Sequence, residues 1–221
     1  MHVAKTSFNG NPNIGLYAFA TDDYCIVGRE VQKKSIRLIE KVLKVKVYQM
    51  NLCGTSLIGV FAVANKKCLL VPDIILESEK EQLEKLKIPF KIIKTKLTAL
   101  GNNIIANDKV AIVNPNFSAE EKSEIGKALG VTVKTGRIAG LEIVGSLAVH
   151  TEKGCLLHRD AEEFELNFIK DNLKVDCETG TVNMGNPYVK SGIITNNNGF
   201  LIGDQSGGPE IALVDEALGF L

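Results

Sequence analysis

The sequence has no tryptophan, and no apolar run approaches the ~20 residues that a membrane-spanning helix needs. The first ten residues, MHVAKTSFNG, also lack the apolar core of a signal peptide. These absences argue against a membrane protein and predict a cytoplasmic one. With 221 residues, 45% hydrophobic and 24% charged, the chain is long enough to bury a core without a metal or a disulfide.

Cysteine occurs only five times, with no Cys-x-x-Cys spacing, at Cys25, Cys53, Cys68, Cys155 and Cys177. An odd number of cysteines in a cytoplasmic chain argues against a disulfide framework and against a zinc site. Four of the five lie in or beside apolar runs, so we interpret them as small hydrophobic residues. We expect no metal and no cofactor.

The motifs that would indicate an enzyme are incomplete. Gly54 and Gly59 have the spacing of a phosphate-binding loop, but Val60-Phe61 replaces the Lys-Ser/Thr pair that holds phosphate and metal. His158-Arg159-Asp160 looks like a kinase catalytic triplet without the accompanying glycine-rich loop and DFG. The three histidines are scattered, although folding could still bring a cysteine and a histidine together. No catalytic motif is therefore complete in the sequence itself.

Net charge is zero but unevenly distributed. Residues 1–100 carry 16 Lys and Arg against 9 Asp and Glu, so residues 101–221 carry 10 against 17. Such asymmetry permits one face to approach RNA or an acidic partner. The basic residues include a run at Lys33, Lys34, Arg37, Lys41, Lys44 and Lys46. A solvated helix face and a contact with RNA or a ribosome both explain this run.

A unit of similar length repeats along the chain. Short polar turns are expected at Thr21, Asn65, Asn107, Thr151 and Asn196, which are 44, 42, 44 and 45 residues apart. Six residues before the first four turns stand Gly15, Gly59, Gly101 and Gly145, and the fifth copy has Lys190 there. A repeat of this period is typical of propellers and related arrays.

Each unit predicts a β-hairpin, a helix and a third strand. The clearest hairpin is Leu97–Pro115. The predicted second strands are Tyr24–Val27, Cys68–Val71, Val110–Val113, Cys155–Leu157 and Phe200–Ile202. The predicted third strands are Val45–Tyr48, Phe90–Ile93, Val131–Val133 and Val175–Cys177. Alanines at Ala18, Ala20, Ala62, Ala64, Ala106 and Ala148 share one strand face, which suits close packing near a crowded axis.

Helices are predicted over 31–43, 79–87, 119–129 and 162–172, and a last one from Pro209-Glu210. Capping boxes at Ser78-x-x-Glu81 and Ser118-x-x-Glu121, with a looser one at Asp160-x-x-Glu163, support their starts. Gly130 suits a helix C-cap.

The last unit lacks a third strand, whereas residues 2–8 alternate like a lone strand. We expect these residues to complete the fifth unit, because closing the ring removes free sheet edges. The predicted fold class is α/β, a five-fold pseudosymmetric propeller of ββαβ repeats in a single domain closed by the N-terminal strand. The approximate repeats are 11–52, 53–97, 98–138, 139–182, and 183–221 with 1–10.

The repeated glycine corners meet at one end of such a ring. Glycine supplies an unusual backbone angle or a close approach, which explains the glycines fully. It does not explain their apolar and small polar neighbours, and that mixture suits a protein–protein interface. Both interpretations stay open at this point.

Several segments, in order and across essentially the whole chain, carry a resemblance. They read CGTSLIGVFAVANK (53–66), LLVP (69–72), LTALGNNIIANDKVAIVNP (97–115), GLEIVGSLAVHTEKGCLLH (140–158) and GTVNMG (180–185). The chain resembles the translation initiation factor six family, the ribosome anti-association factors of archaea and eukaryotes. The resemblance implies the pentein fold, which agrees with the five repeats. The absence of the polar tail of eukaryotic members implies the archaeal type.

The resemblance implies a binding protein that works without catalysis. Such a factor holds the large ribosomal subunit, prevents the small subunit from docking, and acts in large-subunit maturation. The implied contacts are ribosomal proteins uL14 and eL24, near the sarcin–ricin loop of rRNA. An SBDS-type protein and a GTPase related to elongation factor two are the implied release partners. We expect a monomer that does not bind membranes.

When these motifs are aligned with the family, its ribosome-binding face corresponds to the glycine corners of this chain. The corresponding residues are Asn13, Gly15, Leu57, Ile58, Gly59, Leu100, Gly101, Asn102, Val144, Gly145 and Ser146. We expect Leu100 and Asn102 to turn outward, and Asn102 to be the most important, because its amide both donates and accepts. Lys190 departs from the pattern and leaves the fifth corner in doubt.

One alternative belongs to another functional class. The pentein fold also includes deiminases and amidinotransferases, which attack a guanidinium carbon with a cysteine assisted by histidine and carboxylates. Those enzymes commonly carry the nucleophile near the C-terminus, and no cysteine follows Cys177. Their inserted loops are also longer than the short connections expected here.

Overall fold

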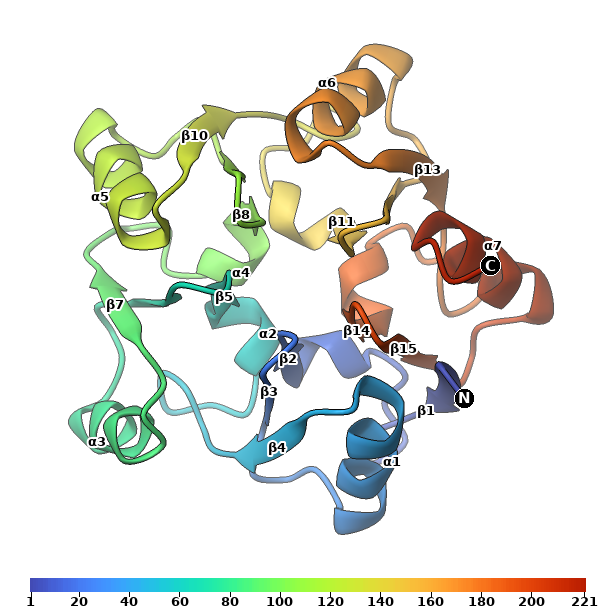
Figure 1. Ribbon diagram of the computed structural model, residues 1–221, viewed down its shortest axis with the longest axis horizontal. Coiled ribbons are helices and arrows are strands. Elements are labelled where there is room, and N and C mark those ends of the chain that lie inside the picture. The colour runs from blue at the N-terminus through green and yellow to red at the C-terminus, as the bar shows by residue number, and fades with distance from the viewer.

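The chain forms a ring of five blades around an axial channel, as a computed structural model of all 221 residues shows (Figure 1). Each blade is a three-stranded sheet, and a long helix lies on its outer side. The predicted fold class, a five-fold pseudosymmetric α/β propeller of ββαβ repeats, is confirmed. No helix is long and apolar enough to cross a lipid bilayer.

Two strands of each blade form an antiparallel hairpin. The inner strands are β2 (Ala18–Ala20), β5 (Val63–Ala64), β8 (Ile104–Ala106), β11 (Ala148–His150) and β14 (Ile193–Asn196). The middle strands are β3 (Tyr24–Val27), β6 (Leu69–Pro72), β9 (Val110–Val113), β12 (Gly154–His158) and β15 (Gly199–Gly203). Five alanines in or beside the inner strands line the axial channel, at Ala18, Ala20, Ala62, Ala106 and Ala148. The sixth alanine expected there, Ala64, packs instead in the core of the second blade, and larger residues such as Phe19 and Ile105 also line the channel.

A helix then crosses to a third strand that pairs in parallel with the middle one. The helices are α1 (Lys33–Leu43), α3 (Glu77–Lys85), α5 (Ala119–Leu129), α6 (Glu163–Leu173) and α7 (Gly208–Ala217). The third strands are β4 (Lys46–Gln49), β7 (Phe90–Ile93), β10 (Thr132–Thr135), β13 (Asp176–Gly180) and, from the N-terminus, β1 (Val3–Thr6).

Strand β1 closes the ring as predicted. It pairs with β15 in the register Val3↔Phe200 to Thr6↔Gly203, and the two termini lie close together in Figure 1. Side chains reinforce this closure, because Asp215 lies 2.9 Å from the Nε2 of His2. The fifth blade is therefore built from both ends of the chain.

The core consists of five clusters of 10 to 12 buried residues, one beneath each long helix. Each cluster also includes residues of a neighbouring blade. Beneath α1, for example, Ile39 and Leu43 pack with Ile194 and Leu201 of the fifth blade. Burying each such side chain contributes about 1.5–3 kcal/mol, so neighbouring blades share their hydrophobic stabilisation.

The predicted element bounds agree with the structure to within one or two residues in most cases. Helix 119–129 is confirmed together with its cap, because Ser118 Oγ accepts from the Glu121 N–H at 3.2 Å. Two other capping predictions are wrong. Glu79 rather than Glu81 accepts from the N–H of Leu76, at 3.0 Å, so α3 begins at Glu77. Glu165 rather than Glu163 has the same role before α6.

Hairpin tips are tied to the helix of the next blade. The last carbonyls of a helix have no partner within it, and turn side chains supply one. The bonds are Asn65 Nδ2 to Leu129 O (2.9 Å), Asn107 Nδ2 to Leu173 O (3.1 Å), Thr151 Oγ1 to Leu218 O (2.8 Å) and Asn196 Nδ2 to Leu43 O (2.9 Å). The last bond joins the fifth blade to the first and closes the ring a second time.

Replacing Asn196 with alanine tests this tie. Its buried Nδ2 also donates to Thr21 O at 3.0 Å, so Asn196→Ala removes a partner from two carbonyls. We expect the free energy of unfolding, measured in urea, to fall by about 2–3 kcal/mol. Asn167→Ala is the control, because this exposed residue of α6 makes no side-chain hydrogen bond, and it should change stability by less than about 0.5 kcal/mol. Equal losses of unfolding free energy in the two variants would contradict a stabilising role of the Asn196 hydrogen bonds.

Candidate functional site

Five short helical turns meet at one end of the axial channel, and we call them the corners. They are η1 (Ile14–Leu16), α2 (Ile58–Phe61), α4 (Leu100–Asn103), η2 (Val144–Ser146) and η3 (Val189–Gly192). In Figure 1 they surround the central opening. The sequence predicted that the run after each glycine is strand, but each glycine lies inside a helical turn and the inner strand begins only afterwards.

Each corner glycine packs against the backbone of the preceding corner. A Cβ on Gly59 would overlap the carbonyl oxygen of Gly15, and Gly101 stands in the same relation to Gly59, and Gly145 to Gly101. Real Cβ atoms essentially never approach another atom within 3.0 Å. None of these glycines has a positive φ, so close packing, rather than a special backbone angle, requires them.

Lys190 completes this circle at the fifth position. A Cβ on Gly15 would overlap the carbonyl oxygen of Lys190, just as Gly59 meets Gly15. The Lys190 side chain enters the axial channel, and its Nζ donates to Gly101 O at 2.5 Å. Burial lowers the pKa of this lysine to about 8. The fifth corner therefore supplies the carbonyl against which Gly15 packs and adds a cation that reaches two blades away.

The structure buries most of the predicted site residues. Gly15, Gly59, Gly101 and Gly145 are buried, and the side chains of Ile58, Leu100 and Val144 have no exposed surface. The expectation that Leu100 turns outward is wrong. The helical turn directs it into the core beside Ile104 and Phe117.

The repeat offered a signal for this burial. The residue before each glycine or Lys190 is large and apolar in all five units, and each is fully buried: Ile14, Ile58, Leu100, Val144 and Val189. A large apolar residue at every equivalent position is typical of a core position rather than of a binding surface.

Accessible side chains stand two places before and one place after each glycine or Lys190. We call these ten residues the corner face: Asn13, Leu57, Ala99, Ile143 and Tyr188, with Leu16, Val60, Asn102, Ser146 and Ser191. All are half-buried or exposed, and none is charged. Depletion of charge with apolar and aromatic residues is typical of the centre of an interface. The sequence predicted only four of these as site residues, namely Asn13, Leu57, Asn102 and Ser146.

Asn102 has a free side chain on this face. Its amide makes no hydrogen bond within the chain, whereas Asn13 Oδ1 accepts from the hydroxyl of Ser191 at 3.2 Å. An unpaired amide offers two donors and an acceptor. Asn102 is therefore able to bond a partner without first breaking an internal bond.

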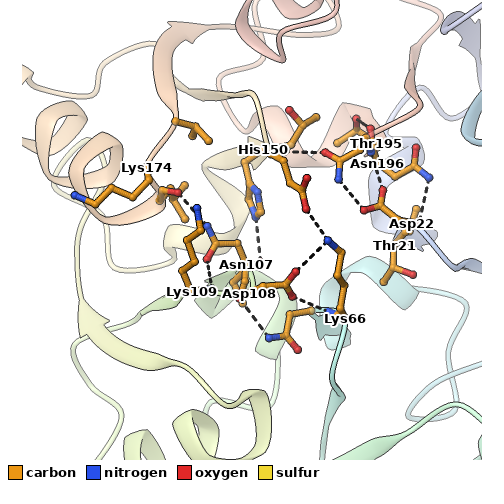
Figure 2. Close-up of a pocket in the computed structure, with 18 residues that line it drawn as sticks. Thr21, Asp22, Lys66, Asn107, Asp108, Lys109, His150, Lys174, Thr195 and Asn196 are labelled. Carbon is orange, nitrogen blue, oxygen red and sulfur yellow. Dashed lines mark hydrogen bonds and ion pairs between the residues drawn. The ribbon is translucent and has the colours of Figure 1, made fainter.

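A second candidate site lies at the opposite, hairpin-tip end of the channel. It is a cavity of about 490 Å³ whose mouth carries Asp22, Lys66, Asp108, Glu152 and Asn197. These groups pair with one another. Lys66 Nζ lies 2.6 Å from Glu152 and 3.3 Å from Asp108 (Figure 2), and the backbone N–H of Asn197 donates to Asp22 at 2.9 Å.

The cavity holds a histidine and carboxylates, but it lacks the cysteine nucleophile of a guanidino-modifying enzyme. Its histidine, His150, lies 3.1 Å from Ala106 O through Nε2 (Figure 2), and burial lowers the pKa of the ring. No cysteine lines the cavity. Cys25, Cys155 and Cys177 are buried, and burial raises the pKa of the half-buried Cys53 thiol to about 12. No cysteine bonds a histidine, so the geometry gives this alternative no support.

Packing of the corners is tested by Gly59→Ala. The added Cβ collides with the backbone of Gly15, which belongs to a neighbouring blade and cannot move alone. We expect a loss of about 3 kcal/mol in unfolding free energy. The control is Gly208→Ala in the first turn of α7, where nothing lies within 4 Å of a Cβ, and stability there should be unchanged or higher by up to about 1 kcal/mol. An unchanged unfolding free energy in Gly59→Ala would disprove the close packing.

Lys190→Met gives a pH test. An unfolded lysine titrates near pH ~10.4, whereas folded Lys190 titrates at about 8. Between these values the unfolded chain binds more protons, so this group makes the fold more stable as pH rises. The melting temperature of the natural protein relative to Lys190→Met should therefore increase between about pH 8 and about pH 10. A difference that stays flat or falls with pH would show that the amine is solvated.

Comparison with known proteins gives independent evidence about the family of this chain. The eIF-6 family model matches residues 3–217. Translation initiation factor 6 of Pyrococcus abyssi is 40% identical over 230 residues, and that of Pyrococcus furiosus is 41% identical over 230, with full coverage of both chains in each case. The factor of Methanocaldococcus jannaschii is 38% identical over 226 residues, covering 99% of each chain.

Among solved structures, the N-terminal domain of ArgZ, covalently bound to a reaction intermediate, aligns with a TM-score of 0.47. The alignment has 10% identity and covers 89% of this chain and 75% of that one. A likeness at this level does not bear on function. The family match and the full-length relatives near 40% identity do, and they show that the chain belongs to the eIF-6 family of translation initiation factors.

Proposed function

We propose that the corner face binds the large ribosomal subunit and keeps the small subunit from joining it. The supporting observation is that ten accessible, uncharged residues are gathered at one end of a ring whose relatives are translation initiation factors. An uncharged face loses little solvation when it is covered. The block is steric, since a body seated on the joining surface excludes the other subunit, and it needs neither catalysis nor a cofactor.

The rigidity of the face supports binding. The corners are held by backbone packing between blades and lie directly over a buried core. A partner therefore meets a surface that loses little conformational freedom on association. A standard protein interface covers about 800 Å² on each side, and a ring end of several corners offers a continuous area for such a contact.

The partners we propose follow from the family. Ribosomal proteins uL14 and eL24, near the sarcin–ricin loop, are the proposed contacts of the corner face. An SBDS-type protein with a GTPase related to elongation factor two is proposed to release the factor during large-subunit maturation in the cytoplasm. We propose that the protein acts as a monomer, because all five corners of one chain already complete the ring.

Sedimentation tests the main proposal. Purified archaeal large subunits are mixed with the protein, separated on a sucrose gradient, and then offered small subunits. The protein should travel with the large subunit and reduce the joined-ribosome peak. If it stays at the top of the gradient and subunits join normally, the proposed function is wrong.

Asn102→Ser tests the corner face itself. Serine removes the amide but keeps a small polar side chain, so we expect the affinity for large subunits to fall about 3- to 10-fold, equivalent to one hydrogen bond. The melting temperature should stay the same, because the Asn102 amide bonds nothing within the chain. Asn167→Ser, on the outer side of α6, is the matched control and should bind normally. A large loss of stability in Asn102→Ser would instead make Asn102 a structural residue.

A further inference from the structure

Five equivalent helices allow one to be compared with the other four. Helices α3, α5, α6 and α7 all have glutamate in the first turn, at Glu77 and Glu79, Glu120 and Glu121, Glu163 and Glu165, and Glu210. Negative charge there complements the positive end of the helix dipole. Helix α1 has no acidic residue in its first turn and begins with Lys33 and Lys34. This one helix therefore carries charge of the unfavourable sign at its N-terminus.

The glutamate that α1 lacks has a structural role elsewhere. Glu79 accepts from the N–H groups of Cys53 and Gly54, at 2.8 and 2.9 Å, in a left-handed turn before its corner. Glu165 and Glu210 hold equivalent turns.

The first blade has the same turn at Asn9-Gly10 but Ser35 in place of the glutamate. Gln32 Nε2 donates to Asn9 Oδ1 at 3.1 Å instead. A neutral contact has replaced a carboxylate beside the two lysines.

The cations of this blade are also without carboxylate partners. Lys33, Lys34, Arg37, Lys41, Lys44 and Lys46, which we call the basic strip, are all exposed. None lies within 4.0 Å of a carboxylate, whereas lysines elsewhere form pairs such as Lys80–Glu77 and Lys170–Asp176. Three of the strip residues, Lys33, Arg37 and Lys41, are spaced by four residues. They therefore follow one side of α1 over most of its ~16 Å length.

The basic strip lies apart from the corner face. Its first residues are at the corner end, because Gln32 contacts the Asn9 turn that leads into Asn13. Its last residues are at the hairpin-tip end, where Asn196 bonds Leu43 O. In Figure 1, α1 lies on the outer side of the first blade. The strip therefore lies at the periphery of the ring, whereas the corners surround its central opening.

We propose that the basic strip docks on the sugar–phosphate backbone of folded RNA. Five of its six cations are lysines, which are depleted at protein interfaces but bind phosphates as point charges. Contacts to phosphates alone carry no sequence information, so the docking is independent of RNA sequence.

The strip has no features that would suit a lipid surface or unpaired bases. None of the exposed large apolar side chains lies on α1 or β4, so an anchor for a lipid surface is missing. The aromatic ring of β4, Tyr48, is half-buried and lies under Lys46 Nζ, 5.1 Å from its centroid. It is therefore not an open platform on which bases could stack.

Salt dependence of RNA binding tests the proposal. The probe is a labelled RNA duplex of about 16 base pairs, titrated with the full chain between about 50 and about 200 mM KCl. The variant combines Lys33→Gln, Lys34→Gln, Arg37→Gln and Lys41→Gln. We expect it to bind about 10-fold more weakly or worse, and the slope of log K against log salt to decrease in magnitude by about 2 to 4, because up to four phosphate contacts are lost.

The control removes the same charge elsewhere, with Lys85→Gln, Lys127→Gln, Lys153→Gln and Lys170→Gln on other blades. It should keep most of the RNA affinity and slope. A variant in which Lys33, Lys34 and Lys41 become arginine retains the charge and should bind normally, with a melting temperature close to that of the natural protein. This charge-preserving variant separates loss of contacts from loss of folding.

Three results would overturn the proposal: equal losses in the strip and control variants, no measurable RNA binding by the natural protein, or binding to anionic phospholipid vesicles in preference to RNA. The assay contains no ribosome, so its failure leaves the corner face untouched. Conversely, Asn102→Ser should bind the RNA duplex normally, which distinguishes the two surfaces.

Discussion

The contact between a corner glycine and the carbonyl of the preceding corner is the constraint on which the ring depends. It repeats at Gly15, Gly59, Gly101 and Gly145, with the Lys190 carbonyl as the partner of Gly15, so four such contacts link the five corner backbones around a single axis. This closeness requires glycine where two corner backbones meet. It also fixes the ten residues of the corner face relative to one another. A surface held in this way is suited to recognising a large, rigid partner.

Five-fold repetition makes departures from the pattern informative. At the axis, Lys190 stands where a fifth glycine would be expected, and its Nζ donates to Gly101 O. Helix α1 departs on the outside, where the first turn has two lysines and none of the glutamates of the other helices. Each departure costs local stability, since one partly desolvates a cation and the other opposes a helix dipole. Places where a local rule is broken without local gain are expected at functional or strained sites.

Much of the fold could be predicted because its signals are local. The turn residues and glycines revealed the repeat, and helix 119–129 was correct because Ser118 and Glu121 are both present to cap it. The direction of Leu100 was predicted wrongly, because a four-residue helical turn is too short to show a helical period, and only the large apolar residue at the equivalent position of every repeat signals the burial. The pairing of α1 with the fifth blade, and the absence of ion pairs along it, depend on distant segments. No local pattern contains that information.

Closure by β1 has a consequence for how the protein is made. Val3 is synthesised 197 residues before its partner Phe200. At about 5–20 residues per second, the first strand waits on the order of 10–40 s for its place in the sheet. The sheet of the first blade can pair early, but its core stays open until Ile194 and Leu201 of the fifth blade have been made. The first and fifth blades are therefore completed together, at the end of synthesis.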